Sequence, residues 1–70
     1  MRTPRLTNNI RRLRFDRNEM TQQALADKVG VTRQTIISIE GGKYAPSLLL
    51  AFQIAAALDM PLEHVFIYAR

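Results

Sequence analysis

The 70-residue sequence contains no cysteine and a single histidine, and both shortages exclude classes of site. Without cysteine there is no disulfide framework, no thiolate zinc site and no cysteine nucleophile. One histidine is too few for most histidine-based metal sites within a single chain. Glycine and proline are also scarce, with three of each, whereas 47% of the residues are apolar. We therefore expect a globular domain that needs no metal or other cofactor, and neither a disordered nor a collagen-like chain.

Long hydrophobic runs are missing as well. The longest stretch without charge covers residues 44–58 and is interrupted by Pro46, Ser47 and Gln53. A segment that spans a bilayer needs about 20 apolar residues, so this stretch is too short. The N-terminal MRTPRLTNN is basic, but no apolar segment follows it, which a secretory signal would require. These features predict a soluble, cytoplasmic protein with no membrane partner.

Positive charge is concentrated in the first third of the chain. Residues 1–20 carry six arginines against Asp16 and Glu19, whereas the charges of residues 21–70 balance. A polyanion such as duplex DNA or RNA is the natural partner for this asymmetry. The plainer alternative is a solvated basic face without a partner.

Short polar turns divide the chain into five segments in which apolar residues recur at helical spacing. No alternation with a period of two is long enough for a strand. Thr21, Thr32 and Ser47 are suited to cap helix N-termini, and Gly30 is suited to end a helix. The sequence thus predicts one all-α, compact five-helix domain over residues 1–70, with helices at 7–17, 22–29, 33–40, 48–58 and 62–67.

Residues 22–41 carry the most specific pattern. Two short helices are joined by a turn that contains Gly30, with Ala26 in the middle of the first helix. Helices that cross steeply need a small side chain where they approach and a glycine where the chain reverses. The apolar residues that would join this unit to the core are Leu25, Val29, Val31, Ile36 and Ile39. The outer face of the second helix has no acidic residue, as a surface that meets phosphates requires, and consists of Thr32, Arg33, Gln34, Ile37, Ser38 and Gly41.

Over nearly its whole length, the chain resembles the helix-turn-helix repressors of the lambda repressor/Cro type, also called the Xre family. The segments that carry the resemblance are Ile10–Arg14, Met20–Gln22, Val29–Ile36, Ile39–Lys43 and Leu58–Phe66. The resemblance implies a lambda-repressor-like fold, double-stranded DNA as the partner and a role in transcription regulation, in a repressor that binds an inverted repeat.

The resemblance also implies roles for individual residues. Arg33, Gln34 and Ser38 match exposed positions of the recognition helix. Gln22 and Lys43 match positions near DNA phosphates. Arg14 and Glu40 match a structural ion pair between the first and third helices.

The chemistry of these side chains agrees with DNA recognition. Arginine can bridge O6 and N7 of guanine, glutamine can bridge N6 and N7 of adenine, and an isoleucine can touch a thymine methyl group. Hydroxyl and amide groups at helix starts, together with first-turn N–H groups, can hold phosphates. We therefore predict that bases are read by Arg33, Gln34, Ile37 and Ser38, and that phosphates are held by Gln22, Thr32 and Lys43.

Plainer interpretations remain open for several residues. Arg33 and Gln34 are alternatively ordinary exposed polar residues, and Ile37 an exposed apolar one. Arg2-Thr3-Pro4-Arg5 is either an arm that reaches into a groove or a frayed chain end. His64 is a lone histidine without a catalytic or metal constellation, and no catalytic set is found elsewhere, so we expect no enzyme.

The segment from Leu48 to Leu58 is apolar on nearly all sides, which predicts that more than one of its faces is covered. Because helix-turn-helix dimers bind half-sites about 34 Å apart, we expect a homodimer through Phe52, Phe66 and Tyr68. Two other functions are compatible with the same domain. One is the antitoxin of a toxin–antitoxin pair, which binds a toxin; the other is an adaptor that binds a protein co-regulator without DNA.

Overall fold

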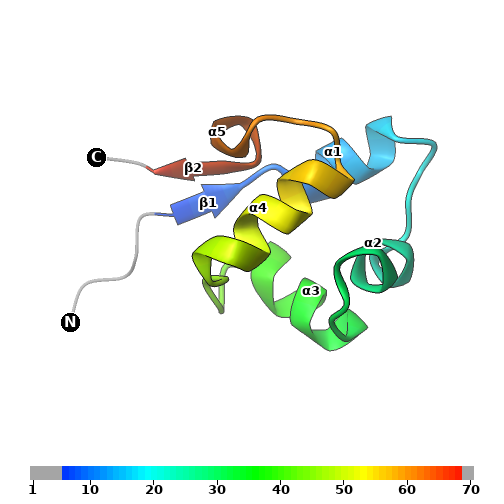
Figure 1. Cartoon of the computed structure of the whole chain (residues 1–70), viewed down its shortest axis with the longest axis horizontal. Helices are drawn as coiled ribbons and strands as arrows, with labels where there is room; N and C mark the ends of the chain where they lie inside the picture. Colours follow the sequence, from blue (N-terminus) through cyan, green and yellow to red (C-terminus); the bar gives the residue numbers. More distant parts are fainter. Residues whose placement is uncertain (1–5, 69–70) are drawn as a thin grey trace.

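The computed structural model describes residues 6–68, which form five helices and one two-stranded sheet (Figure 1). In chain order the elements are β1 (Leu6–Asn8), α1 (Ile10–Asp16), α2 (Gln22–Val29), α3 (Arg33–Glu40), α4 (Leu48–Ala57), α5 (Leu62–Val65) and β2 (Phe66–Tyr68). Helix α4 lies across the middle of the domain, with α2 and α3 below it and the sheet and α5 above it in the view of Figure 1. Helices α2 and α3, which form the helix-turn-helix unit, and the sheet therefore lie on opposite sides of one central helix.

The predicted helix ends are confirmed at the residues that cap them. The hydroxyl groups of Thr21, Thr32 and Ser47 each accept a hydrogen bond from the backbone N–H three residues later, at 2.9, 3.2 and 3.1 Å. Gly30 follows α2 with φ of 74°, in the left-handed region that glycine tolerates without strain. These local bonds satisfy backbone groups that a helix cannot pair internally, and so they fix where α2, α3 and α4 begin.

All five helices contribute to one hydrophobic core. The helix-turn-helix unit supplies its inner faces, and α4 supplies the face that packs against α2 and α5. The largest fully buried side chains are Ile10, Leu25, Ile36, Ile39, Ile54, Leu58 and Val65. The core therefore holds α2 and α3 at a defined angle and leaves the opposite face of α3 at the surface.

The five-helix prediction is confirmed, but the all-α class is not exact. Strands β1 and β2 are antiparallel, with Leu6 opposite Tyr68 and Asn8 opposite Phe66. Helix α1 consequently begins at Ile10, not at residue 7, and α5 ends at Val65, not at residue 67. Strands of three residues are too short to display an alternating pattern, and their pairing joins residues about 60 positions apart in the chain. No local signal in the sequence predicts such a contact.

Two predictions concern residues outside the range 6–68. The candidate arm at residues 2–5 lies outside the described residues, and the extent of the domain over residues 1–70 stays a prediction. Within residues 6–68, no helix has both the length and the apolar character that a membrane crossing demands.

Candidate DNA interface

The helix-turn-helix unit fixes one face of α3 and frees the other. After α2 the chain reverses at Gly30, and the N–H of Val31 donates to the carbonyl of Ala26 at 3.0 Å. Ile36 and Ile39 of α3 are then buried against the core. Because side chains three or four positions apart share a helix face, burial of these two leaves the opposite face of α3 outward.

The outward face of α3 carries the four residues that we predicted to read bases. Arg33 and Gln34 are exposed in its first turn, and Ile37 and Ser38 are half-buried one turn further on. The structure thus brings the four residues together on one surface strip. None of them is acidic. The strip therefore presents cationic, amide, hydroxyl and methyl groups, which can contact the donors, acceptors and methyl groups of base edges.

The predicted phosphate residues lie at the two ends of this strip. Thr32 is exposed at the start of α3, and its hydroxyl is already engaged as the helix cap and with the Thr35 hydroxyl at 3.0 Å. The main donors to a phosphate at the start of α3 are therefore the unpaired N–H groups of its first turn. Lys43 is exposed in the loop after α3, where its N–H donates to the Ser38 carbonyl at 3.0 Å.

Gln22 is less free than the resemblance implied. It is half-buried at the start of α2, and its Nε2 donates to Oε1 of Glu40 at 3.4 Å. One N–H of its amide group remains for a phosphate, because the group carries two donors. The contact ties the first residue of α2 to the last residue of α3.

Arg14 and Glu40 are joined in a nearly buried ion pair, with side chains 13% and 10% exposed. Arg14 Nε lies 2.5 Å from one carboxylate oxygen of Glu40, and Nη2 donates to the other at 3.1 Å. Arg14 Nη1 also donates to the Met20 carbonyl at 2.7 Å. The network holds α1, the start of α2 and the end of α3 together, and it neutralises the carboxylate closest to the α3 strip.

Asn8 has a structural role that the sequence analysis missed. Its Nδ2 donates to the Ile39 carbonyl at 3.0 Å, and its Oδ1 accepts from the Ile10 N–H at 3.1 Å. The side chain therefore satisfies the first N–H of α1 and a carbonyl at the end of α3 at the same time. Asparagine before an apolar helical segment is a cap signal, but its bond to α3 depends on tertiary structure.

Comparisons with known proteins agree with this geometry. A model of the helix-turn-helix family matches residues 10–65. An uncharacterized HTH-type transcriptional regulator of Methanocaldococcus jannaschii is 57% identical over 51 residues, which cover 73% of this chain and 77% of that protein. The HTH-type transcriptional regulator YgzD of Bacillus subtilis, also uncharacterized, is 48% identical over 61 residues, which cover 87% and 91%.

A solved structure has a similar fold. The restriction-modification controller protein C.AhdI of Aeromonas hydrophila matches with a TM-score of 0.72 and 29% identity, over 79% of this chain and 78% of that chain. The chain belongs to the helix-turn-helix family. This family consists of DNA-binding transcriptional regulators, so the resemblance and the expectation of a regulator that is not an enzyme are confirmed.

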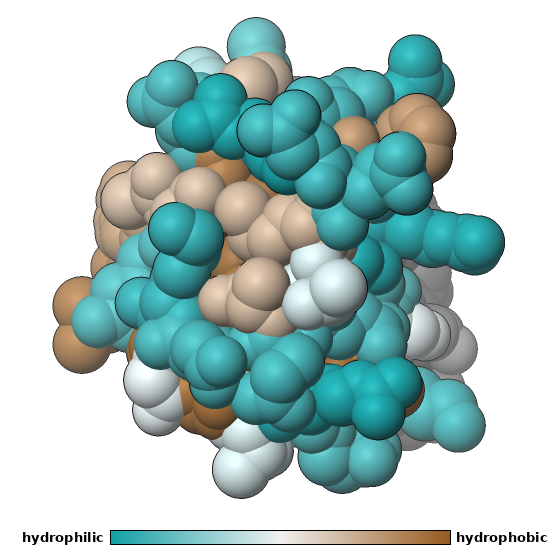
Figure 2. Space-filling model, turned by 90° about the vertical axis from the view of Figure 1, so that its right-hand side faces the viewer, coloured by the Kyte–Doolittle hydropathy of each residue, from teal (hydrophilic) through white to brown (hydrophobic). Residues whose placement is uncertain are grey.

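The surface of this helix-turn-helix protein is not uniformly polar. The side that carries α2 is mostly hydrophilic, with a pale strip of weakly apolar residues (Figure 2). On α4, by contrast, large apolar side chains are exposed, and these are Leu48, Leu49 and Phe52. Leu48 and Leu49 were not singled out from the sequence, because an apolar helix does not reveal which of its sides the core covers.

The three residues that we predicted for a dimer interface lie at this apolar surface. Phe52 is 53% exposed and Tyr68 is 70% exposed, whereas Phe66 is half-buried against the core. Phe66, Tyr68 and Leu48 line one open hollow of about 470 Å³ between α4, α5 and the sheet. Phe52 lies one turn along α4 from Leu48, so it borders the same surface without lining the hollow.

Proposed function

We propose that the protein binds an inverted repeat in DNA as a homodimer and represses transcription from the promoter that contains it. The observation that carries the proposal is the outward strip of α3, which is free of carboxylates and held rigidly by a buried inner face. A recognition helix needs both properties, because base edges are read by side chains whose positions are fixed before binding.

Four side chains are proposed to read bases. Arg33 and Gln34 project from the first turn of α3, the part of a recognition helix that enters the major groove most deeply. Their bidentate contacts to guanine and adenine are each worth about 1–3 kcal/mol of base discrimination. Ile37 and Ser38 are half-buried, so they approach the bases with only part of their surface. We expect Ile37 to contact a thymine methyl group and Ser38 to donate or accept a single hydrogen bond.

Phosphate contacts are proposed at both ends of α3. The remaining amide N–H of Gln22, whose side chain contacts Glu40, is one donor near the end of α3, and the first-turn N–H groups that follow Thr32 are donors at its start. Lys43 adds a cation beyond the other end of the helix. Such contacts set the register of the protein on DNA and do not read sequence.

The homodimer is proposed through the exposed apolar surface of α4 and β2. Two copies that bury Phe52 and Tyr68 against each other remove large apolar side chains from water, at about 25 cal/mol per Å². A twofold pair also presents two copies of α3, and these match the two halves of an inverted repeat. Repression is proposed because it needs only occupancy of the promoter, whereas activation needs an additional contact with RNA polymerase.

The experiment that tests the proposal is selection of bound sequences from a random pool of duplex DNA. We expect an enriched inverted repeat with half-sites about one helical turn apart. Arg33→Ala and Gln34→Ala should each relax preference at one base pair of the half-site, and a promoter carrying the repeat should lose activity when the protein is present. Absence of enrichment, with only weak salt-sensitive binding, would contradict the proposal and direct attention to a protein partner such as a toxin or co-regulator.

The likeness to a restriction-modification controller protein favours one class of regulated genes. The second candidate function is control of a restriction endonuclease and its methyltransferase. The selected inverted repeat distinguishes this function, since it should then occur upstream of such genes in the genome that encodes the chain.

A further inference from the structure

We infer that Arg11 of α1 is a further contact to the DNA backbone, so that the bound surface extends from the recognition helix onto α1. The inference rests on the proposed function and adds to it a residue that neither the sequence pattern nor the relatives assign. It follows from the position of Arg11 beside α3, from its lack of an ion pair within residues 6–68 and from the nearby cation Lys43.

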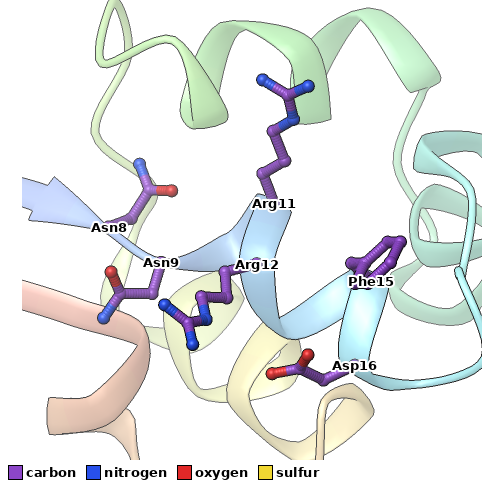
Figure 3. Close-up of a pocket in the computed structure, with 6 residues that line it drawn as sticks. All are labelled: Asn8, Asn9, Arg11, Arg12, Phe15 and Asp16. Atoms are coloured by element: carbon purple, nitrogen blue, oxygen red, sulfur yellow. The ribbon is translucent and has the colours of Figure 1, made fainter.

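The face of α1 that carries Arg11 is turned towards the end of α3. Asn8, three residues before Arg11, donates to the Ile39 carbonyl, and Arg14, three residues after it, pairs with Glu40. Residues three apart on a helix share a face, so Arg11 lies on the face of α1 from which Arg14 reaches Glu40, and Asn8, at the end of β1, contacts the same part of α3. Figure 3 shows its side chain rising from α1 towards α3 with the guanidinium group at the outer end.

The charge of Arg11 is free to meet a phosphate. Within residues 6–68 the ion pairs are Arg14–Glu40 and Arg17–Asp59, and Arg11 takes part in neither. Glu40 is the carboxylate closest to the end of α3, and Arg14 already neutralises it. Asp16 lines the same open hollow of about 610 Å³ but forms no ion pair with Arg11, which is therefore an exposed cation beside the recognition helix.

A second cation, Lys43, lies on the other side of Asn8 from Arg11. Lys43 and Asn8 line one hollow, and Asn8 and Arg11 line the next, so the two cations flank Asn8 beyond the end of α3. The sugar–phosphate backbone runs along both edges of the major groove that a recognition helix enters. Lys43 and Arg11 are placed to meet one such edge together, which is a stronger arrangement than either cation alone.

Arg12 provides a matched control on the adjacent position of α1. It is also exposed, and it belongs to neither ion pair of residues 6–68. It lines the same hollow as Arg11, but its side chain leaves α1 on the other side (Figure 3) and also lines a hollow with Glu63 and His64 of α5. Removal of either arginine changes the net charge equally, so only position separates the two variants.

The test compares Arg11→Gln with Arg12→Gln in DNA binding by fluorescence anisotropy, on the selected inverted repeat and on an unrelated duplex, from about 50 to about 200 mM salt. For Arg11→Gln we expect roughly tenfold weaker binding on both duplexes, with base preference unchanged. The slope of log affinity against log salt should fall by about 0.9 for each Arg11, hence by about 1.8 for a dimer. Arg12→Gln should bind within about twofold of the parent with the parent slope, and both variants should melt at the parent temperature.

Each other outcome overturns the inference. An Arg11→Gln variant with the parent slope would show that Arg11 touches no phosphate. Equal losses in both variants would show a general effect of net charge and no contact at this position. A parent protein that binds no duplex at all would refute the proposed function and this inference with it, whereas parent binding with an unchanged Arg11→Gln variant refutes the inference alone.

Discussion

Helices α3 and α4 begin in the same way, and each buries a stripe of apolar side chains. Their exposed faces nevertheless differ in polarity. Each starts at a hydroxyl residue, Thr32 or Ser47, that accepts from the N–H three positions on. Each places apolar side chains of one face in the shared core. The outward side of α3 then carries Arg33 and Gln34, whereas the outward side of α4 carries Phe52 and two leucines.

The difference shows that the exposed face, and not the helix itself, indicates the partner. Since the inner faces already stabilise the domain, the outer faces are free to serve other contacts. A polar face without carboxylates matches a hydrated polyanion. A face of large apolar side chains matches another apolar surface, because a monomer gains nothing from exposing it. Substitutions confined to one helix or to one face therefore test this difference.

The largest loss of stability is expected when the ion pair that ties α3, but not α4, to α1 is broken. Glu40→Ala leaves the nearly buried guanidinium of Arg14 without its partner, which typically costs about 3–5 kcal/mol. A domain of this size has a total stability of roughly 4–10 kcal/mol, so the variant should be partly unfolded at 37 °C. Urea denaturation followed by circular dichroism measures the loss.

The exposed pair Arg17–Asp59 is the control for this prediction. Its closest N–O distance is 3.7 Å and both side chains are exposed, so Arg17→Ala should cost less than about 1 kcal/mol. Equal losses in the two variants would show that burial does not distinguish the pairs, contrary to the geometry.

The apolar face of α4 is expected to lose its partner when it receives a charge. Phe52→Glu should weaken the proposed dimer by more than about a hundredfold, or about 3 kcal/mol, because the carboxylate must be desolvated at the interface. Gln53→Glu adds the same charge at the neighbouring exposed position of the same helix. Sedimentation equilibrium at micromolar concentration measures both. A parent protein that is monomeric there, or equal effects of the two changes, would refute the interface.

Local chemistry explains why most of the fold was predictable. The helix ends at Thr21, Thr32, Ser47 and Gly30 depend on bonds within four residues, and the sequence displays those residues directly. The sheet depends on a contact between the two ends of the described chain, which no window of sequence contains. The helix boundaries next to the sheet were misplaced for the same reason.

The candidate site divides in a similar way. The residues on the outward face of α3 follow from periodicity within one helix, and the structure brings Arg33, Gln34, Ile37 and Ser38 together as that periodicity predicts. Residues on other helices could not be assigned, because their relation to α3 is tertiary. Asn8 reaches α3 only because the fold places the end of β1 beside the end of α3, and Arg11, on the helix that follows, points towards α3 (Figure 3).

Gly30, in the turn before α3, is expected to tolerate substitution less well than Gly41, which follows α3 directly. Gly30→Ala puts a Cβ on a residue with φ of 74°, and the left-handed conformation costs a non-glycine residue about 1–2 kcal/mol. No atom lies within 4 Å of the added carbon, so the loss reports conformation and not a clash. Gly41→Ala is the comparison, since Gly41 has an ordinary φ of −78°; its Cβ would lie 3.3 Å from the Ile37 carbonyl oxygen, so we expect a loss there too, but a smaller one. Thermal unfolding measures both, and a larger loss at Gly41 would contradict the assignment.

The smallest changes test the comparison between α3 and α4 most directly. Thr32→Ala and Ser47→Ala each remove one cap bond, so each should destabilise the domain by about 1 kcal/mol. Only Thr32 lies at the start of the proposed recognition helix. Thr32→Ala should therefore also weaken DNA binding by a few-fold on every sequence, because the first-turn N–H groups that face a phosphate are less well held. Thermal unfolding and anisotropy on the selected repeat separate the two effects. A loss of DNA affinity in Ser47→Ala that equals the loss in Thr32→Ala would show that binding follows general stability and that the start of α3 meets no phosphate.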